Sequence, residues 1–238
     1  MNRIMKVGVA ALAIAAMVPA FANEEEVEDQ RDEVVGWTPV ALGLATPVQV
    51  PWGLNRWDVF GLDLNVFYAD APKMYGIDIG GLATTTRNDL IGLDVSGLLN
   101  LACQDVYGLR ATLGVNFHGQ GVYGMDAGLL SFGDKLCGLG VHFLGSAQHN
   151  MCGCQIGGLA CVSSVESYGA SIAGICNLAR TAYGLQLALL YNMTEDLHGA
   201  QIGLVNYTRL CPGGFQIGLI NIIRENCWPV LPIVNASF

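Results

Sequence analysis

Side chains that could do chemistry recur at a regular interval along this chain. Counted from a repeated glycine, the second residue after it is usually polar, with carboxylates in the first half of the chain and amides in the second. These residues are Asp63, Asp78, Asp94, Arg110, Asp126, Gly140, Gln155, Ser171, Gln186, Gln201 and Gln216. If units stack, adjacent carboxylates repel. We expect them to be solvated; the alternatives are compensation by Arg110 or a cation such as Ca²⁺ among Asp63, Asp78 and Asp94.

Other residues of catalytic type share no arrangement. The four histidines occupy different unit positions, so they indicate neither a Cys-His pair nor a Ser-His-Asp triad. A lone C-x-C at Cys152 and Cys154 is more often structural than metal-binding. The glycines follow strand periodicity and open no helix, which excludes a phosphate loop or dinucleotide fingerprint. The sequence predicts no catalytic, cofactor-binding or metal residue. The histidines are His118, His142, His149 and His198.

These residues belong to a tandem repeat. Eleven segments, from GLDLNVFY to GFQIGLIN, align without gaps, and their leading glycines lie 14 to 16 residues apart. Positions one and three after the glycine are mostly Leu, Ile, Met or Val, the period-two alternation of a strand with one buried face. We therefore expect an all-β array with positions one and three buried. The glycines are Gly61, Gly76, Gly92, Gly108, Gly124, Gly138, Gly153, Gly169, Gly184, Gly199 and Gly214.

The glycine itself marks a break in this alternation. The residue two before it is often apolar, as at Val59, Met74, Val106 and Leu197, and is out of phase with positions one and three. An aromatic residue often stands directly before the glycine. The chain must bend or bulge here, because a residue without Cβ permits it.

A unit of about fifteen residues fits two architectures. In a parallel solenoid, equivalent residues stack about 4.8 Å apart, whereas in an antiparallel up-and-down barrel they alternate between opposite ends of the sheet. Six of eight cysteines form pairs about one period apart, which would let stacked coils form disulfides in an exported protein. The pairs are Cys137 with Cys152, Cys161 with Cys176, and Cys211 with Cys227.

Proline and asparagine also favour the solenoid. Prolines lie near both ends of the array, where an open edge tolerates a residue that cannot donate to a ladder. Asparagines recur after the strand, as expected for amides stacked in a turn column. The prolines are Pro47, Pro51, Pro229 and Pro232, and the asparagines are Asn100, Asn177, Asn192, Asn206, Asn221 and Asn235.

Three features favour the alternative, an outer-membrane barrel of about 12 strands. The C-terminal strand is apolar and ends at Phe238, aromatic residues flank many glycines, and the hydropathy is high. No stretch approaches eighteen uninterrupted apolar residues, so helical membrane spans are not expected.

The N-terminal residues predict export. Arg3 and Lys6 precede an apolar stretch and an Ala-Phe-Ala sequence ending at Ala22, the layout of a signal peptide over residues 1–22. Residues 23–36 are rich in acids and predict a disordered leader, followed by a single β-repeat domain over residues 37–238. The net charge of −9 argues against nucleic-acid binding.

The segments GAQIGLVN and GFQIGLIN and the ending from Pro229 to Phe238 resemble a family of bacterial surface-repeat proteins with tandem G-L-Q-[IL]-G-L-[VI]-N units. The resemblance spans about residues 45 to 238. The middle units depart from it, with Arg110, Gly140 and Ser171 where Gln is usual. It implies an exported, surface-associated protein without established activity.

Together these observations predict an exported structural or interaction protein of the outer membrane, cell surface or periplasm, with an unknown envelope partner and no catalytic activity. A pore-like barrel is the alternative. A polysaccharide-active β-helix enzyme is a further alternative, although coils of this length leave little room for the loops that build a cleft.

Overall fold

The structure, a computed structural model, describes residues 34–45, 48–52 and 56–237. The predicted signal peptide (1–22) and residues 23–33 of the acidic segment lie outside the described residues. The strands are β1 Gly36–Ala45, β2 Val48–Val50, β3 Trp57–Ala71, β4 Met74–Gly80, β5 Ala83–Thr86, β6 Leu90–Ser96, β7 Leu99–Ala102, β8 Val106–Thr112, β9 Val115–Gly157, β10 Ala160–Ala173, β11 Cys176–Ala188, β12 Tyr191–Ile202, β13 Val205–Ile223 and β14 Val230–Ser237.

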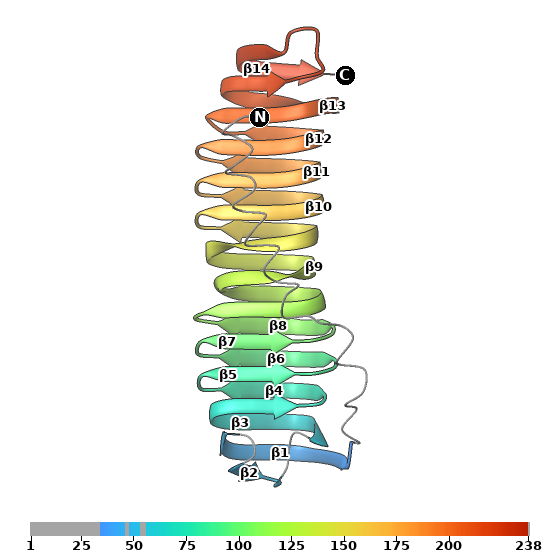
Figure 1. Cartoon of the computed structure of the whole chain (residues 1–238), viewed down its shortest axis with the longest axis vertical. Coiled ribbons are helices and arrows are strands. Elements are labelled where there is room, and N and C mark those ends of the chain that lie inside the picture. The colour runs from blue at the N-terminus through green and yellow to red at the C-terminus, as the bar shows by residue number, and fades with distance from the viewer. Residues whose placement is uncertain (1–33, 46–47, 53–55, 238) are drawn as a thin grey trace, which may run out of the picture.

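Each repeat makes one coil of a parallel β-solenoid of about ten turns (Figure 1). A coil consists of a first strand such as β4, a bend, a second strand such as β5, and a return turn to the next coil. First strands pair only with first strands, as β4 does with β6, and second strands with second strands, as β5 does with β7. The predicted solenoid is confirmed. The antiparallel barrel is wrong, because successive units run parallel and glycine pairs with glycine.

Antiparallel strands close both ends of the described stack. At one end β2 pairs with β1, and at the other β14 pairs with β13, with Asn235 opposite Gln216. Pro51 follows β2, and Pro232 lies within β14, which is the last strand in the order of the sheet. Proline has no N–H to donate, and at the ends of the sheet this costs no hydrogen bond between interior strands. Pro47 lies outside the described residues.

The face of the first strand that points inward is opposite to the one predicted. Position-two side chains are buried, with Asp78 and Arg110 both 0% exposed, whereas position-one and position-three side chains face outward, with Ile77 41% and Ile79 40% exposed. The apolar interior is formed instead by the column two residues before the glycine. Its buried members are Val59, Met74, Leu90, Val106, Val122, Leu136, Met151, Ala182 and Leu197.

The glycine bulge lets both interior columns belong to one strand. At Gly108, φ is +140°, and an added Cβ would lie 2.0 Å from the carbonyl oxygen of Gly92 in the preceding coil. This conformation is essentially restricted to glycine. The predicted bend is confirmed, and it turns the residues two before and two after the glycine to the same side.

The structure does not show the predicted disulfides: all eight cysteines are free thiols. Cys137 and Cys152 interact with each other, one residue before the stacked glycines Gly138 and Gly153, so this pairing stays a prediction. The other two pairs are not in register. Cys161 aligns with Asn177 and Cys176 with Ala160, so this pair is one residue out of register and its side chains point to different sides. Cys211 is buried in β13, whereas Cys227 is exposed beyond the end of that strand. Equal spacing in sequence does not ensure register, because the units differ in length by a residue.

Candidate functional site in the solenoid interior

The polar column of the first strands runs through the interior of the solenoid. Asp63, Asp78, Arg110 and Asp126 are 0% exposed and Asp94 is 1% exposed. The expectation that these side chains are solvated is therefore wrong. Removing a carboxylate from water disfavours its charged form, so each must find a partner or hold a proton.

No cation among the described residues offsets the burial of Asp63 and Asp78 at the acidic end of the column. Burial is the main cause that raises the pKa of Asp63 to about 7, while the Asn65 amide, 2.5 Å from its Oδ1, opposes the rise. Burial, reinforced by the neighbouring Asp94 and Asp63, raises the pKa of Asp78 well above its usual value. Among the described residues, neither oxygen of Asp78 has a hydrogen-bond partner. This end of the interior therefore favours protonated carboxyl groups.

The contacts of Asp94 also favour a protonated carboxyl group. Thr84 Oγ1 lies 2.9 Å from Asp94 Oδ1 and 2.6 Å from Asn100 Oδ1. A hydroxyl has one hydrogen to donate, and the Asn100 oxygen can only accept. A proton on Asp94 satisfies the second contact. Burial raises the pKa of Asp94 to about 6, and Arg110 limits the rise.

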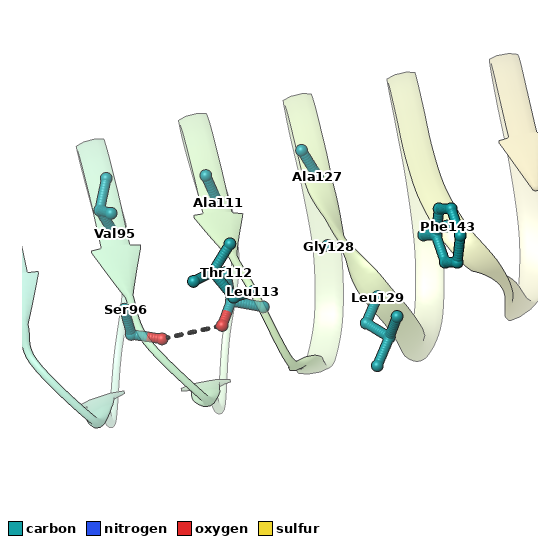
Figure 2. Close-up of a pocket in the computed structure, with 9 residues that line it drawn as sticks. All are labelled: Val95, Ser96, Ala111, Thr112, Leu113, Ala127, Gly128, Leu129 and Phe143. Carbon is teal, nitrogen blue, oxygen red and sulfur yellow. Dashed lines mark hydrogen bonds between the residues drawn. The ribbon is translucent and has the colours of Figure 1, made fainter.

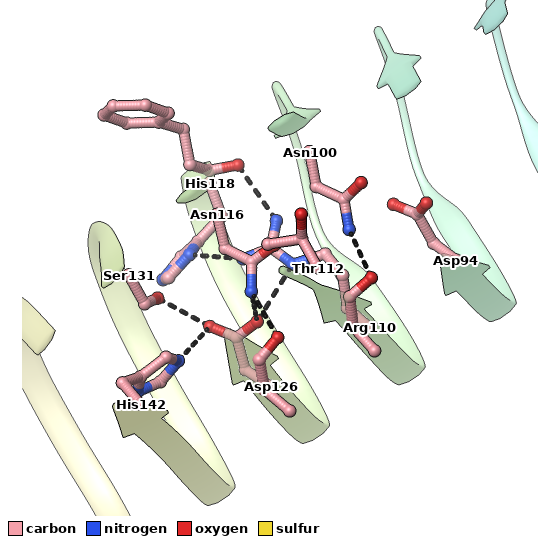
Figure 3. A network of polar contacts seen from close by, with 12 residues as sticks. Asp94, Asn100, Arg110, Thr112, Asn116, His118, Asp126, Ser131 and His142 are labelled. Atoms are coloured by element: carbon pink, nitrogen blue, oxygen red, sulfur yellow. Dashed lines mark hydrogen bonds and ion pairs between the residues drawn. The ribbon is translucent and has the colours of Figure 1, made fainter. Parts of the chain in front are cut away.

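Arg110 and Asp126 form the centre of a buried cluster (Figure 3). Arg110 Nε donates to Asp126 Oδ1 at 3.1 Å, and Nη1 donates to the Phe117 carbonyl at 2.9 Å. Ser131 Oγ donates to Asp126 Oδ2 at 2.6 Å, and His142 Nε2 lies 3.3 Å from the same oxygen. Burial alone would raise the pKa of Asp126, but Arg110 and then His142 hold it below its usual value. The predicted compensation by Arg110 is thus realised for Asp126 and, over a longer distance, for Asp94.

His118 completes this cluster as a neutral ring. Arg110 Nη2 lies 3.0 Å from His118 Nδ1, and because a guanidinium only donates, Nδ1 must accept. Burial, followed by repulsion from Arg110, lowers the pKa of His118 to about 3. The next coil leaves room for the ring with a glycine, since a Cβ on Gly133 would lie 2.2 Å from the imidazole.

Amides replace charges in the second half of the interior. Asn177 Nδ2 donates to Asn192 Oδ1 at 3.0 Å, and Asn192 and Asn206 each donate to the next asparagine at 2.8 Å. A parallel ladder joins Gln216, Gln201 and Gln186 at 2.8 Å per step. An amide both donates and accepts, so each ladder continues without any charge. The predicted asparagine stack is confirmed for these coils, although it lies inside the solenoid.

Replacing Asp78 by asparagine should stabilise the fold at neutral and alkaline pH. A raised pKa means that the folded state holds a proton that the unfolded chain releases above pH 3.8, so the stability of the native protein falls as pH rises from about 4 through the folded pKa. The amide of the Asp78→Asn variant would not titrate. In urea unfolding, the variant's advantage should be largest at pH 8 and should shrink towards pH 4.

The exposed Asp134 supplies the control for this experiment. Its side chain is 56% exposed, so Asp134→Asn should leave the pH dependence unchanged. Equal curves for native protein and Asp78→Asn at every pH would show that Asp78 is ionised and compensated in the fold.

The structure gathers residues that sequence reasoning left apart. His118 and His142, expected to share no place, both contact the Arg110–Asp126 pair, whereas His149 is exposed near Asp134 at the return turn. The sequence signal that could have identified the cluster is which strand face points inward. If position two after the glycine faces inward, position four lies on the same face, and His142 occupies position four of its unit. Within the described residues, no group of three or more His, Cys, Asp or Glu side chains could hold a metal ion.

The polar side chains of the interior are therefore buried and do not contact solvent. In the described part of the chain, no helix is long and apolar enough to span a membrane. Comparison of the chain with protein-family models, curated proteins and solved structures finds no match.

Proposed function

We propose that this protein is an exported structural or interaction protein of the bacterial envelope that works through its outer surface and catalyses no reaction. The observation that carries this proposal is the burial of the polar column. Its carboxylates, arginine and histidines contact one another inside the solenoid instead of lining a surface cleft.

This burial argues against the polysaccharide-cleaving alternative. Such chemistry requires carboxylates that reach the glycosidic bond. Asp78 and Asp94 are 0% and 1% exposed, and Thr84 lies between Asp94 and the Asn100 amide. Both carboxylates therefore contribute to the packing of the interior and to its pH dependence.

Two features of the sequence support the envelope location. Residues 1–22 have the layout of a signal peptide, and the last units resemble a family of exported surface-repeat proteins. The repeated coils give a long surface of uniform composition, which suits a scaffold or a partner that binds along its length.

Export should be visible as processing of the chain in a bacterial host. The protein should be recovered from the envelope or periplasm with a mass that corresponds to cleavage after Ala22. A variant with Leu12→Arg and Ile14→Arg, which interrupts the apolar stretch, should keep its full length and remain in the cytoplasm. An unprocessed native protein in the cytoplasm would refute the proposed location.

A further inference from the structure

The outer surface of the solenoid is apolar over both strands and the bend between them. We call this surface the apolar wedge; it comprises positions one, three, five and six after the glycine and the outward residues of the second strand. Asp70, which pairs with Arg87, is the one charged side chain at these positions among the described residues. Highly exposed members are Val66, Phe67, Leu82, Leu98, Leu113, Phe143, Leu159, Ile175, Leu189, Leu190, Leu204, Leu219 and Ile220.

The bend forms the ridge of this wedge. Leu113 is 83% exposed and Phe143 is 75% exposed, although both are large apolar side chains. They border a shallow depression of about 310 Å³ that Ala111, Ala127 and Leu129 also line (Figure 2). An apolar surface that continues along the whole stack is larger than a monomeric protein exposed only to water normally carries.

Charged side chains gather at the opposite edge, on the return turns. Arg180 pairs with Glu195 at 3.3 Å, and Arg209 lies between Asp196 and Glu225 at 3.5 and 4.0 Å. Asp134 and Lys135 lie at another return turn. Both signs are present, so this edge does not select a strongly charged partner.

Aromatic residues directly before the glycine form a column, interrupted at Ile91, Cys137, Cys152 and Gly213, between the wedge and the charged edge. Phe60 stacks on Tyr75 at 4.6 Å, Tyr107 on Tyr123 at 5.0 Å, and Tyr168 on Tyr183 at 4.6 Å. The column borders the charges directly, since the Tyr107 hydroxyl lies 3.4 Å from Asp105 and Lys135 Nζ lies 5.4 Å from the Tyr123 ring. Aromatic rings between an apolar and a polar zone are typical of a lipid–water interface.

The geometry points to a lipid surface as the partner of this protein: the solenoid lies along a bilayer with the apolar wedge among the acyl chains and the return turns in water. This inference rests on the proposed envelope role and names its partner. From the aromatic column to the bend, six or seven extended residues span about 20 Å, on the scale of one leaflet of about 15 Å. Backbone groups of the strands are paired between coils, which is required beside lipid.

A second copy of this chain fits the wedge less well. One apolar face of ten coils measures roughly 48 Å by 15 Å, close to the approximately 800 Å² per partner of a stable interface. A flat contact between two copies would cover that face but leave the face beyond the bend exposed. Acyl chains can cover both faces and the ridge together.

Vesicles of phosphatidylcholine test this inference with the full chain. The protein should float with the vesicles in a density gradient. The variant Leu113→Glu with Phe143→Glu, which adds two charges to the ridge, should bind at least tenfold more weakly. The control, Gln120→Glu with Asn150→Glu, adds the same charges at the return turns of the same two coils and should bind like the native protein.

A depth measurement separates the wedge from the apolar N-terminal segment. Leu113→Trp should be quenched by brominated phosphatidylcholine beyond the native tryptophan signal, whereas Gln120→Trp should not. No flotation, equal flotation of both charge variants, or equal quenching at the two positions would overturn the inference. A dimer in vesicle-free solution that the ridge variant dissociates, without flotation of the native protein, would assign the wedge to a second copy. Export and processing are measured without vesicles, so they can succeed while lipid binding fails.

Discussion

Replacing Gly108 by alanine should destabilise the protein by more than about 3 kcal/mol. The new Cβ would lie 2.0 Å from the carbonyl oxygen of Gly92. The φ of +140° at Gly108 is a backbone conformation that residues other than glycine rarely adopt. The clash involves backbone in the neighbouring coil, so no side-chain rotation relieves it. Urea unfolding monitored by circular dichroism measures the loss.

Gly213→Ala is the matched control for this experiment. Gly213 directly precedes the last repeat glycine, and a Cβ placed there would meet no atom within 4 Å. This variant should unfold within about 1 kcal/mol of the native protein. If Gly108→Ala were equally mild, the stacked coils could not approach as closely as the structure has them.

Replacing Arg110 by methionine should cost about 3–5 kcal/mol, the usual penalty for leaving a buried charge without its partner. Asp126 is completely buried and receives the Arg110 Nε–H at 3.1 Å. Methionine preserves much of the side-chain volume but leaves the carboxylate without its cation. Urea unfolding at pH 7 gives the difference in the free energy of unfolding.

Two further variants make this prediction specific. Arg110→Met combined with Asp126→Asn should recover part of the loss, because the double variant removes both charges. Arg180→Met breaks an ion pair whose side chains are 67% and 54% exposed, and it should cost no more than about 1 kcal/mol. A loss for Arg110→Met as small as that for Arg180→Met would mean that solvent reaches Asp126.

The repeat and its local geometry follow from the sequence alone. Glycines 14 to 16 residues apart, alternating strand residues and an apolar residue two before each glycine predict stacked β units with a bulge. The asparagine column was also predictable, because asparagine recurs at nearly the same position of successive units and parallel stacking places such residues side by side, as it does Asn192 and Asn206. Charge compensation by Arg110 was only an alternative at the sequence level, because the position that Arg110 shares with the carboxylates was expected to face solvent.

The tertiary structure alone decided which side of each strand faces inward. Period-two alternation separates the two faces of a strand without identifying which face is buried. Because of the bulge, the apolar residues two before the glycine, such as Met74, lie on the opposite face from those at positions one and three, and either set could have formed the interior. Met74 is buried, and Asp78 and Arg110 are buried on the same side of the sheet. Ile77 and Ile79 face outward. The second strand closes this interior, bringing Thr84 to Asp94 and His118 to Arg110. Such contacts depend on register between coils, which spacing in one chain does not specify.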